Sequence, residues 1–308
     1  MKIAVIGSTN TEMIFKTPRI PKAGETVLGS SFSMSPGGRG VNQAIAAARS
    51  GGQVVFVGRT GNDIFGTEVL NVLQRDNIDT TYVTRDPELA SGMSSMVLDA
   101  HGEAGITITP GANVNLEANH LIQARDAISA ADVVLIQLDI PTETVRYAAD
   151  LARSSGARVI LNPAPALPVS DEILRSISIL TPDASQAEIL TGITITDERS
   201  AELAGRILLE RGLSRVIITL RTKGAMVIDN GGAEHVPGFK LTKIDTSVVN
   251  DVFNGTLALG LAENKNFYEA VLFANAAAAL SASRPGTLTS IPYREEILEV
   301  IKNVRKVY

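Results

Sequence analysis

Hydrophobic residues along the chain fall into two arrangements, short continuous apolar runs and longer stretches with helical periodicity. The apolar runs predict strands covered on both faces, at 2–6, 53–57, 132–137, 158–161 and 215–220. The periodic stretches predict helices at 40–50, 64–76, 143–154, 185–190, 198–211, 250–263, 267–283 and 294–306. Strands separated by helices are typical of βαβ units, so the pattern predicts an α/β fold with a mostly parallel sheet.

Two regions depart from this alternation. Proline and glycine interrupt residues 17–36, where short strand-like pieces such as 25–28 fit better than an amphipathic helix. A second β-like region spans 93–98 and 105–109, with a turn at 101–102. We expect these regions, about 12–36 and 92–110, to form a small β subdomain outside the main sheet.

Composition narrows the class of protein. The 308 residues carry 28 Lys and Arg against 33 Asp and Glu, and a net charge of −5 argues against a nucleic-acid binder. The absence of cysteine excludes disulfides, thiolate metal sites and a cysteine nucleophile. No apolar run approaches the roughly 20 residues needed to span a membrane, and no signal peptide is apparent, so we expect a cytoplasmic protein.

The first segment that suggests chemistry is P-G-G-R-G-V-N-Q-A at 36–44. Its glycines would allow a ligand to approach the backbone, and a helix that starts just after them offers free N–H groups. Arg39 and Asn42 add donors at the same edge. Taken alone, a loop entering a helix is the simpler interpretation.

The second segment is D-T-S-V-V-N-D-V-F-N-G at 245–255, which precedes an apolar helix. Asp251 would lie in the first turn of that helix, where a carboxylate is stabilised as the anion. Such a group suits a base that accepts a proton from a hydroxyl. Taken alone, an aspartate that merely begins a helix is the simpler interpretation.

Together and in this order, the two segments resemble the signatures of ribokinase-like (PfkB family) carbohydrate kinases, G-G-x-G-x-N-x-A and D-T-x-G-A-G-D-x-F-N-G. N-P-A-P-A at 162–166 and I-T-L-R-T-K-G at 218–224 are similar to further family landmarks. The resemblance covers nearly the whole chain. It implies one domain over residues 1–308, with a three-layer αβα core and the two β regions as a lid. It also implies ATP-dependent transfer of the γ-phosphoryl group to a hydroxymethyl of a pentose or related sugar.

The resemblance assigns roles by position. Asp251 matches the catalytic base, and Val248, Val249 and Asn250 match the loop that faces the phosphoryl group. The positions that match sugar contacts are Asn10, Glu12, Gly38, Arg39, Asn42 and Asp139. Those that match the nucleotide region are Thr219, Arg221, Lys223, Gly224 and Asn275, with Asp183 and Gln186 supporting Mg²⁺. A K⁺ site is implied at Asp245 and Ser247 and near Ser290, and a homodimer is implied through the lid.

Several of these positions depart from the family pattern. Val248-Val249-Asn250 replaces Gly-Ala-Gly before the base, and we expect Asn250 to cap its own helix and compete with phosphate for the same amides. The N-x-x-E motif reads D-A-S-Q at 183–186, which moves the charge from the fourth position to the first. Glu12, Arg39 and Asp139 stand where ribokinases carry Asp, Lys and Glu, which predicts a substrate other than plain ribose.

Two functions therefore remain open from the sequence. The first is a sugar kinase that uses ATP and Mg²⁺, with K⁺ as a further cation. The second is a catalytically weakened relative that binds a sugar or a nucleotide and has a regulatory role. The resemblance over nearly the whole chain favours the kinase. The altered loop is the reason to keep the second function as an alternative, because loss of one oxyanion donor typically costs ~10²–10³ in rate.

Overall fold

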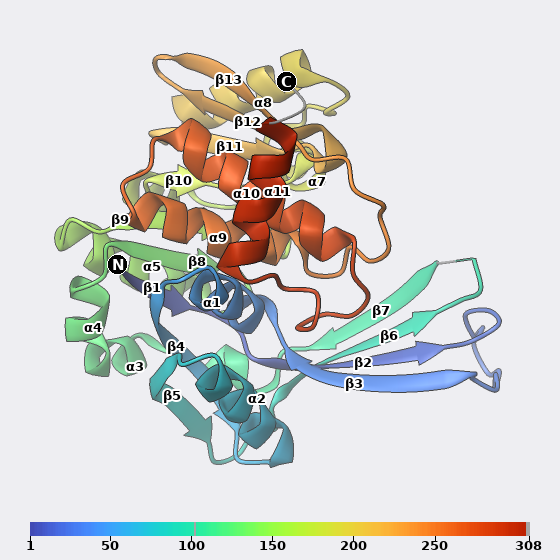
Figure 1. Cartoon of the computed structure of the whole chain (residues 1–308). Helices are drawn as coiled ribbons and strands as arrows, with labels where there is room; N and C mark the ends of the chain where they lie inside the picture. Colours follow the sequence, from blue (N-terminus) through green and yellow to red (C-terminus); the bar gives the residue numbers. More distant parts are fainter. Residues whose placement is uncertain (102, 306–308) are drawn as a thin grey trace.

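The computed structural model describes residues 1–101 and 103–305. Its centre is a nine-stranded sheet in the order β13-β12-β11-β10-β9-β8-β1-β4-β5, parallel from β11 to β5 and antiparallel at the β12 and β13 edge (Figure 1). The strands are β1 (Lys2–Ile6), β4 (Gln53–Gly61), β5 (Asp79–Asp86), β8 (Val133–Gln137), β9 (Arg158–Asn162), β10 (Ile179–Leu180), β11 (Arg215–Thr219), β12 (Gly224–Asp229) and β13 (Gly232–Pro237). The predicted α/β class and mostly parallel sheet are confirmed.

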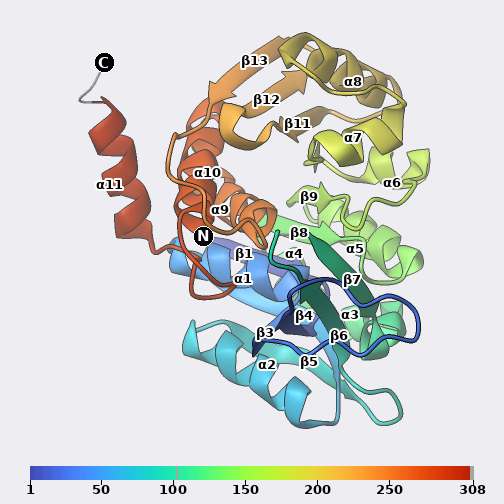
Figure 2. The ribbon, with the colours of Figure 1, turned by 90° about the vertical axis from the view of Figure 1, so that its right-hand side faces the viewer.

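Helices cover both faces of this sheet, which gives the three layers expected (Figure 2). One face carries α1 (Arg39–Arg49), α2 (Ile64–Arg75), α9 (Val249–Ala262), α10 (Phe267–Ala282) and α11 (Arg294–Arg305). The other carries α3 (Ala118–Gln123), α4 (Arg125–Ser129), α5 (Thr142–Ser154), α6 (Asp171–Ser176), α7 (Ala184–Thr191) and α8 (Glu198–Glu210). Within residues 1–101 and 103–305, no helix is long and apolar enough to cross a membrane.

The continuous apolar runs follow from this double covering. Side chains alternate along a strand, so Ile3 and Val5 of β1 join the core under α1 and α9, while Ala4 and Ile6 join the core on the opposite face. All four side chains are fully buried. A strand covered on both faces has no polar positions to reveal its alternation, and it appears in the sequence as an unbroken apolar run.

Most predicted elements are confirmed to within a few residues, but the strand expected at 25–28 is wrong. That segment is an exposed loop, and the strand begins later, at Ser31. The sequence pattern also misses β5, β10, β12 and β13. β5 is a half-exposed edge strand and β10 has two residues, so neither shows an apolar run. His101 lies in a turn as expected, whereas residue 102 lies outside the described residues.

A second, four-stranded sheet, called the lid below, extends away from the core (Figure 1). Its strands are β3 (Ser31–Gly37), β2 (Asn10–Lys16), β6 (Gly92–Leu98) and β7 (Ala104–Thr109), in that order. The expected limits, 12–36 and 92–110, agree with these strands to within two residues. β2 follows β1 after only residues 7–9, so the lid begins at the carboxyl end of a central strand.

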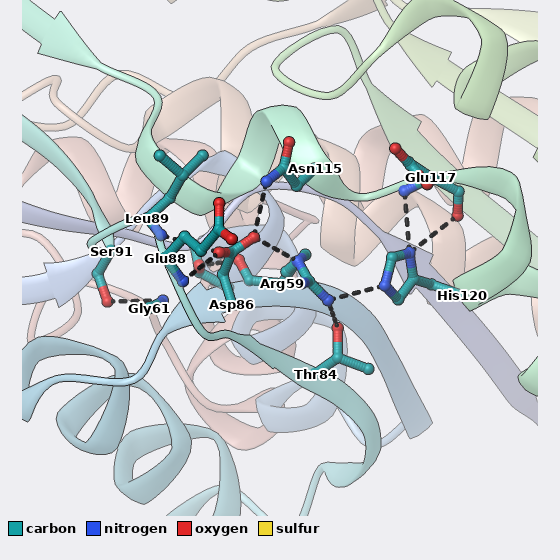
Figure 3. A network of polar contacts seen from close by, with 11 residues as sticks. Arg59, Gly61, Thr84, Asp86, Glu88, Leu89, Ser91, Asn115, Glu117 and His120 are labelled. Atoms are coloured by element: carbon teal, nitrogen blue, oxygen red, sulfur yellow. Dashed lines mark hydrogen bonds and ion pairs between the residues drawn. The ribbon is translucent and has the colours of Figure 1, made fainter.

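A buried ion pair at the base of the lid holds the segment that leads into β6 (Figure 3). Arg59 Nε lies 2.9 Å from Asp86 Oδ2, and the Asp86 side chain is 2% exposed. The Asp86 carboxylate also accepts hydrogen bonds from the backbone N–H of Leu89 and from Asn115, in the 3-10 helix Gly111–Asn115. These hydrogen bonds hold the pKa of Asp86 well below its usual range. The loop before β6 and the 3-10 helix after β7 are thereby fixed together.

Gly38 shows why the first motif requires glycine. It precedes α1 with φ of 95°, a backbone conformation that residues with a Cβ rarely adopt. A Cβ at this position would lie 2.8 Å from the backbone N of Asn10. The start of α1 therefore lies directly against the backbone that joins β1 to β2.

We expect Gly38→Ala to lower the free energy of unfolding by about 3 kcal/mol or more, because it combines backbone strain with a steric clash. Gly156→Ala is the matched control, because Gly156 has φ of 84° but a Cβ there would meet open space. The control should lose only about 1–2 kcal/mol. Urea unfolding measures both, and equal losses would show that the close contact at Gly38 is unimportant.

Candidate active site

The N-terminal ends of three helices lie at the carboxyl ends of the central parallel strands. Asp251 lies in the first turn of α9, Asn42 and Gln43 lie in α1, and Asp183 precedes α7. This edge of an open α/β sheet is where such folds bind ligands. The structure thus brings together the predicted base, the first motif at 36–44 and the segment 183–186 expected to support Mg²⁺.

Asp251 is a buried carboxylate held by neutral amides. Its side chain is 6% exposed, its Oδ1 accepts from Gln43 Nε2 at 2.9 Å, and its Oδ2 accepts from Asn42 Nδ2 at 3.1 Å. Burial raises the pKa of Asp251 to about 6, although Arg39 and the two amides oppose the shift. A carboxylate with this pKa can both accept and release a proton near neutral pH.

Three further charged side chains predicted to contact the sugar lie around this carboxylate. Arg39 Nη1 lies 2.6 Å from Asp139 Oδ1, in an ion pair in which the Asp139 side chain is 10% exposed. Burial raises the pKa of Asp139 despite Arg39. Burial, and then repulsion from Asp251, raises the pKa of Glu12 to about 7, although hydrogen bonds from the Gly38 backbone and Asn42 oppose the shift. The site therefore holds three carboxyl groups against one guanidinium.

Asn10 is positioned by a residue that no sequence signal marks. Asn113 donates to Asn10 Oδ1 at 3.0 Å, donates to the backbone carbonyl of Thr9, and accepts from the Thr9 N–H at 2.8 Å. Asn113 is 1% exposed. It lies in the 3-10 helix after the lid and contacts the chain more than 100 residues away, so only the fold reveals its role.

The expected self-capping by Asn250 is wrong. Val248 precedes the helix, and no side chain caps its first turn. Asn250 is the second residue of α9, so its backbone is already helical, whereas a capping residue lies before the helix. Its Nδ2 instead donates to Asp183 Oδ2 at 3.1 Å. The amides of this turn are therefore not blocked by Asn250.

The segment 183–186 forms a capping box at the start of α7. Asp183 Oδ1 accepts from the Gln186 N–H at 2.8 Å, and Gln186 Oε1 accepts from the Asp183 N–H at 3.0 Å. Both oxygens of Asp183 therefore have donors, one from Gln186 and one from Asn250. The two departures from the family pattern, at 183 and 250, contact each other.

The segments expected to surround a cation also lie together. Asp245 Oδ1 accepts from the N–H and hydroxyl of Ser247, and Asp245 Oδ2 accepts from the Gly286 N–H at 3.1 Å. Ser290 is buried, and its hydroxyl contacts Ser281 and donates to the Thr287 carbonyl. No group of three or more histidine or carboxylate side chains that could hold a metal ion occurs in the described part of the chain.

The positions expected to bind the nucleotide follow β11. Thr219 forms a bridge with Asp183, so this end of the strand adjoins α7. Gly224, with φ of 101°, pairs with Pro237 at the start of the β12–β13 hairpin. Asn275 of α10 donates to the carbonyls of Val236 and Pro237, both at 3.1 Å.

The remaining two positions of this group lie in the short 3-10 helix Arg221–Lys223. Arg221 has φ of 56° and is exposed, and Lys223 Nζ lies 3.4 Å from the carbonyl of Thr196. The structure thus places both cationic side chains at the surface beside the end of β11. It assembles the predicted nucleotide positions along one edge.

Comparison with known proteins agrees with this arrangement. A model of the pfkB family of carbohydrate kinases matches residues 1–294. The chain is 38% identical to a ribokinase of Haemophilus influenzae, over 98% of each chain, and 33% identical to a deoxyribokinase of Salmonella typhi, over 98% of this chain and 99% of that one. These matches, with the fold and site described above, define an α/β carbohydrate kinase. The chain belongs to the pfkB family.

Solved structures give the same result for the fold. An Arabidopsis thaliana ribokinase complexed with ribose and ATP superposes with a TM-score of 0.92 at 28% identity, covering 97% of this chain and 98% of that one. A Thermotoga maritima ribokinase superposes with a TM-score of 0.89 at 35% identity, covering 98% and 99%. The three-layer core and separate small sheet are thus shared with these ribokinases.

The raised pKa of Glu12 predicts a pH-dependent stability. The folded-state pKa of about 7 exceeds the ordinary value of 4.5, so folding stability falls as pH rises between these values. Glu12→Gln, which mimics the neutral form, should stabilise the protein by about 1–2 kcal/mol at pH 8 and by nothing near pH 4. Thermal unfolding at the two pH values measures this difference.

Glu25→Gln provides a control in the same measurement, because the pKa of Glu25 is lowered whereas that of Glu12 is raised. A hydrogen bond from Arg19 lowers the pKa of Glu25, so its charged form is the favoured one. The control should not gain stability at pH 8. A gain for Glu12→Gln that is equal at both pH values would contradict the predicted linkage.

Proposed function

We propose that this protein is an ATP-dependent kinase that phosphorylates a hydroxymethyl group of a pentose or related sugar. Its relatives named ribokinase and deoxyribokinase, and the Arabidopsis ribokinase complex with ribose and ATP, support this substrate class. The single observation that carries the proposal is Asp251. It is a buried carboxylate with a pKa of about 6, in the first turn of α9 and hydrogen-bonded to Asn42.

In the proposed reaction, Asp251 accepts the proton of the sugar hydroxyl. The hydroxyl oxygen forms a bond to the γ-phosphorus, and the bond from that phosphorus to the bridging oxygen breaks, which releases ADP. Backbone N–H groups of Val249, Asn250 and Asp251 at the N-terminus of α9 stabilise the transferring anionic group. Asn10, Glu12, Gly38, Arg39, Asn42 and Asp139 hold the sugar.

The altered loop is compatible with this reaction. Val248 and Val249 change the shape of the approach but retain their peptide N–H groups. Asn250 donates its side chain to Asp183 rather than accepting from these amides, so they remain available to an anion. This geometry supports a kinase over a relative that only binds its ligand.

Cations would complete the site. Mg²⁺ prefers oxygen ligands and neutralises charge on ATP phosphates, and the Asp183 carboxylate, with Gln186 beside it, supplies suitable oxygens. Asp245 and Ser247 supply oxygens for a K⁺ ion next to the turn at Gly286. Ser290 contributes through the fold of that turn, because its hydroxyl is engaged with Ser281.

Nucleotide binding is proposed at the edge that follows β11. Thr219, Arg221, Lys223 and Gly224 line the turn into β12, and Asn275 fixes the neighbouring backbone. Because the chain carries a net charge of −5, attraction of the triphosphate must come from such local cations and helix N-termini.

Sugar-dependent ADP release, measured with ATP, Mg²⁺, K⁺ and a panel of pentoses and related sugars, tests the proposal. We expect Asp251→Asn to lower kcat by ~10²–10⁴ while sugar binding is retained, because it removes the general base. Asp76→Asn, which breaks an ion pair with Arg49 at the far end of α1, is the control and should keep its activity.

Two outcomes would contradict the proposal. One concerns the function and the other concerns the role of Asp251. Sugar binding by the wild-type protein without ADP release would favour the non-catalytic relative. Turnover that persists in Asp251→Asn would contradict the assigned base.

A homodimer through the lid is proposed from its exposed apolar side chains. Strand alternation places Phe15, Phe32 and Met34 on one face, and Ile106 and Ile108 on the other face with Glu12. Each of these five apolar side chains is at least 37% exposed, and the rings of Phe15 and Phe32 pack together 4.9 Å apart. Apolar surface on a sheet that extends away from the core fits a second copy of the same sheet.

We expect light scattering coupled to gel filtration to give twice the chain mass of 32.5 kDa. Phe32→Glu and Ile106→Glu introduce a charge on opposite faces, so the variant that becomes monomeric identifies the contacting face. Dimers that survive both substitutions would exclude the lid as the interface.

A further inference from the structure

Beneath Asp251 lies a group of buried amide side chains that the proposed reaction does not use. Gln43 of α1 is at its centre and is fully buried. We propose that Gln43 is a positioning residue, which orients the carboxylate of Asp251 and sets its affinity for the proton. This inference rests on the proposed function, in which Asp251 is the base.

Every polar atom of the Gln43 side chain has a partner. Its Nε2 donates to Asp251 Oδ1 at 2.9 Å and to Asn162 Oδ1 at 3.1 Å, and its Oε1 accepts from Gln137 Nε2 at 2.7 Å. Rotating the amide by 180° would place Oε1 against Asp251 Oδ1 and Asn162 Oδ1, and Asn162 is held in its orientation by its own hydrogen bond to the Thr181 carbonyl. The network therefore permits one orientation of Gln43, in which it donates to the base.

Gln137 shows that this orientation is maintained at a cost. Its own Oε1 is buried without a hydrogen-bond partner among the described residues, next to Gly7. An unsatisfied buried acceptor is unfavourable, and such groups are uncommon in folded proteins. Gln137 nevertheless keeps its Nε2 toward Gln43. The structure thus leaves Gln137 Oε1 without a hydrogen bond and keeps Gln43 as a fixed donor to Asp251.

A chain of hydrogen bonds also connects Asn162 of this network to α9. Asn162 donates to the carbonyl of Thr181 at 3.2 Å, and the Thr181 hydroxyl donates to Asn254 Oδ1 at 2.5 Å. Asn254 Nδ2 then donates to the carbonyl of Asn250 at 2.8 Å. The network thus connects the ends of β8, β9 and β10 to the helix turn that carries the base. Gln43 is the member of this network that contacts the Asp251 carboxylate.

The surrounding charges make this neutral donor important. Arg39, Asp139 and Glu12 are the charged groups that act on Asp251, and Arg39 is already paired with Asp139. The hydrogen bond from Gln43 is thus one of the interactions that oppose the effect of burial on the pKa of Asp251. Without it, the carboxylate would hold its proton to higher pH and could rotate away from the sugar hydroxyl.

Gln43→Met tests this role, because methionine has a similar length and lacks the amide. Two readouts are compared with wild type, the acid limb of kcat against pH and the ¹³C NMR titration of the Asp251 carboxyl, assigned by its loss in Asp251→Asn. Both midpoints should move upward by about 1 pH unit. At pH 5, below both midpoints, kcat should fall about tenfold with little change in KM, whereas at pH 7 the lower ionised fraction of Asp251 should reduce kcat only about twofold.

Thr256→Val is the matched control. Thr256 of α9 and Ser50, the residue that follows α1, form another buried polar contact at 3.3 Å, which does not involve Asp251. This variant should lose stability without a change in either midpoint. If Gln43→Met moves the midpoints no further than Thr256→Val does, the positioning role is excluded.

A second variant keeps the test decisive if Gln43→Met does not fold. Gln137→Met removes the donor that fixes Gln43 without touching Asp251, and it should shift both midpoints in the same direction by a smaller amount. An unchanged titration in this variant would contradict the role of Gln43. Because NMR titration requires no turnover, an absence of ADP release in the wild type would overturn the proposed function while still leaving this inference tested.

Discussion

The contact between α1 and α9 is the constraint on which the site depends. At Gly255, a Cβ would lie only 2.2 Å from the carbonyl oxygen of Gln43, so the two helices approach within backbone contact. One turn earlier on α9, the same approach brings Asp251 within hydrogen-bond distance of Asn42 and Gln43. The glycine that ends the second motif thus determines where the carboxylate of that motif lies. Without this close packing, the two motifs would not share a site.

Local periodicity explains how much of the fold the sequence predicts. Strands such as β1 are buried on both faces and helices such as α5 are amphipathic, so their patterns are strong and their limits are correct to within a few residues. β5 is half exposed and β10 has two residues, so neither carries such a pattern. One role of Gly38 is hidden in the sequence for a related reason. Gly38 makes room for the backbone at Asn10, a contact that local sequence does not reveal.

The sequence predicts roles for Asp251 and Arg39 through two motifs that resemble family signatures, and the structure brings these two residues close together. Roles that depend on long-range contacts are not predicted. Asn113 acts on Asn10 across more than 100 positions, and neither residue indicates the other in the sequence. The departures at Asp183 and Asn250, which are separate in the sequence, form one hydrogen bond in space. A substitution that looks disruptive in a motif can therefore be half of a compensated pair.

The continuity of β2 gives the lid the character of a lever. This strand begins at Asn10, carries Glu12 near its base and runs without interruption to Lys16, a length of roughly 23 Å. Its base is fastened by Asn113 and, through the loop before β6, by the Arg59 and Asp86 pair. Because the strand is continuous, a rotation about Asn10 would displace Lys16 about three times as far as it displaces Glu12. Contacts at the far end of this strand therefore bear on Glu12, one of the residues proposed to hold the sugar.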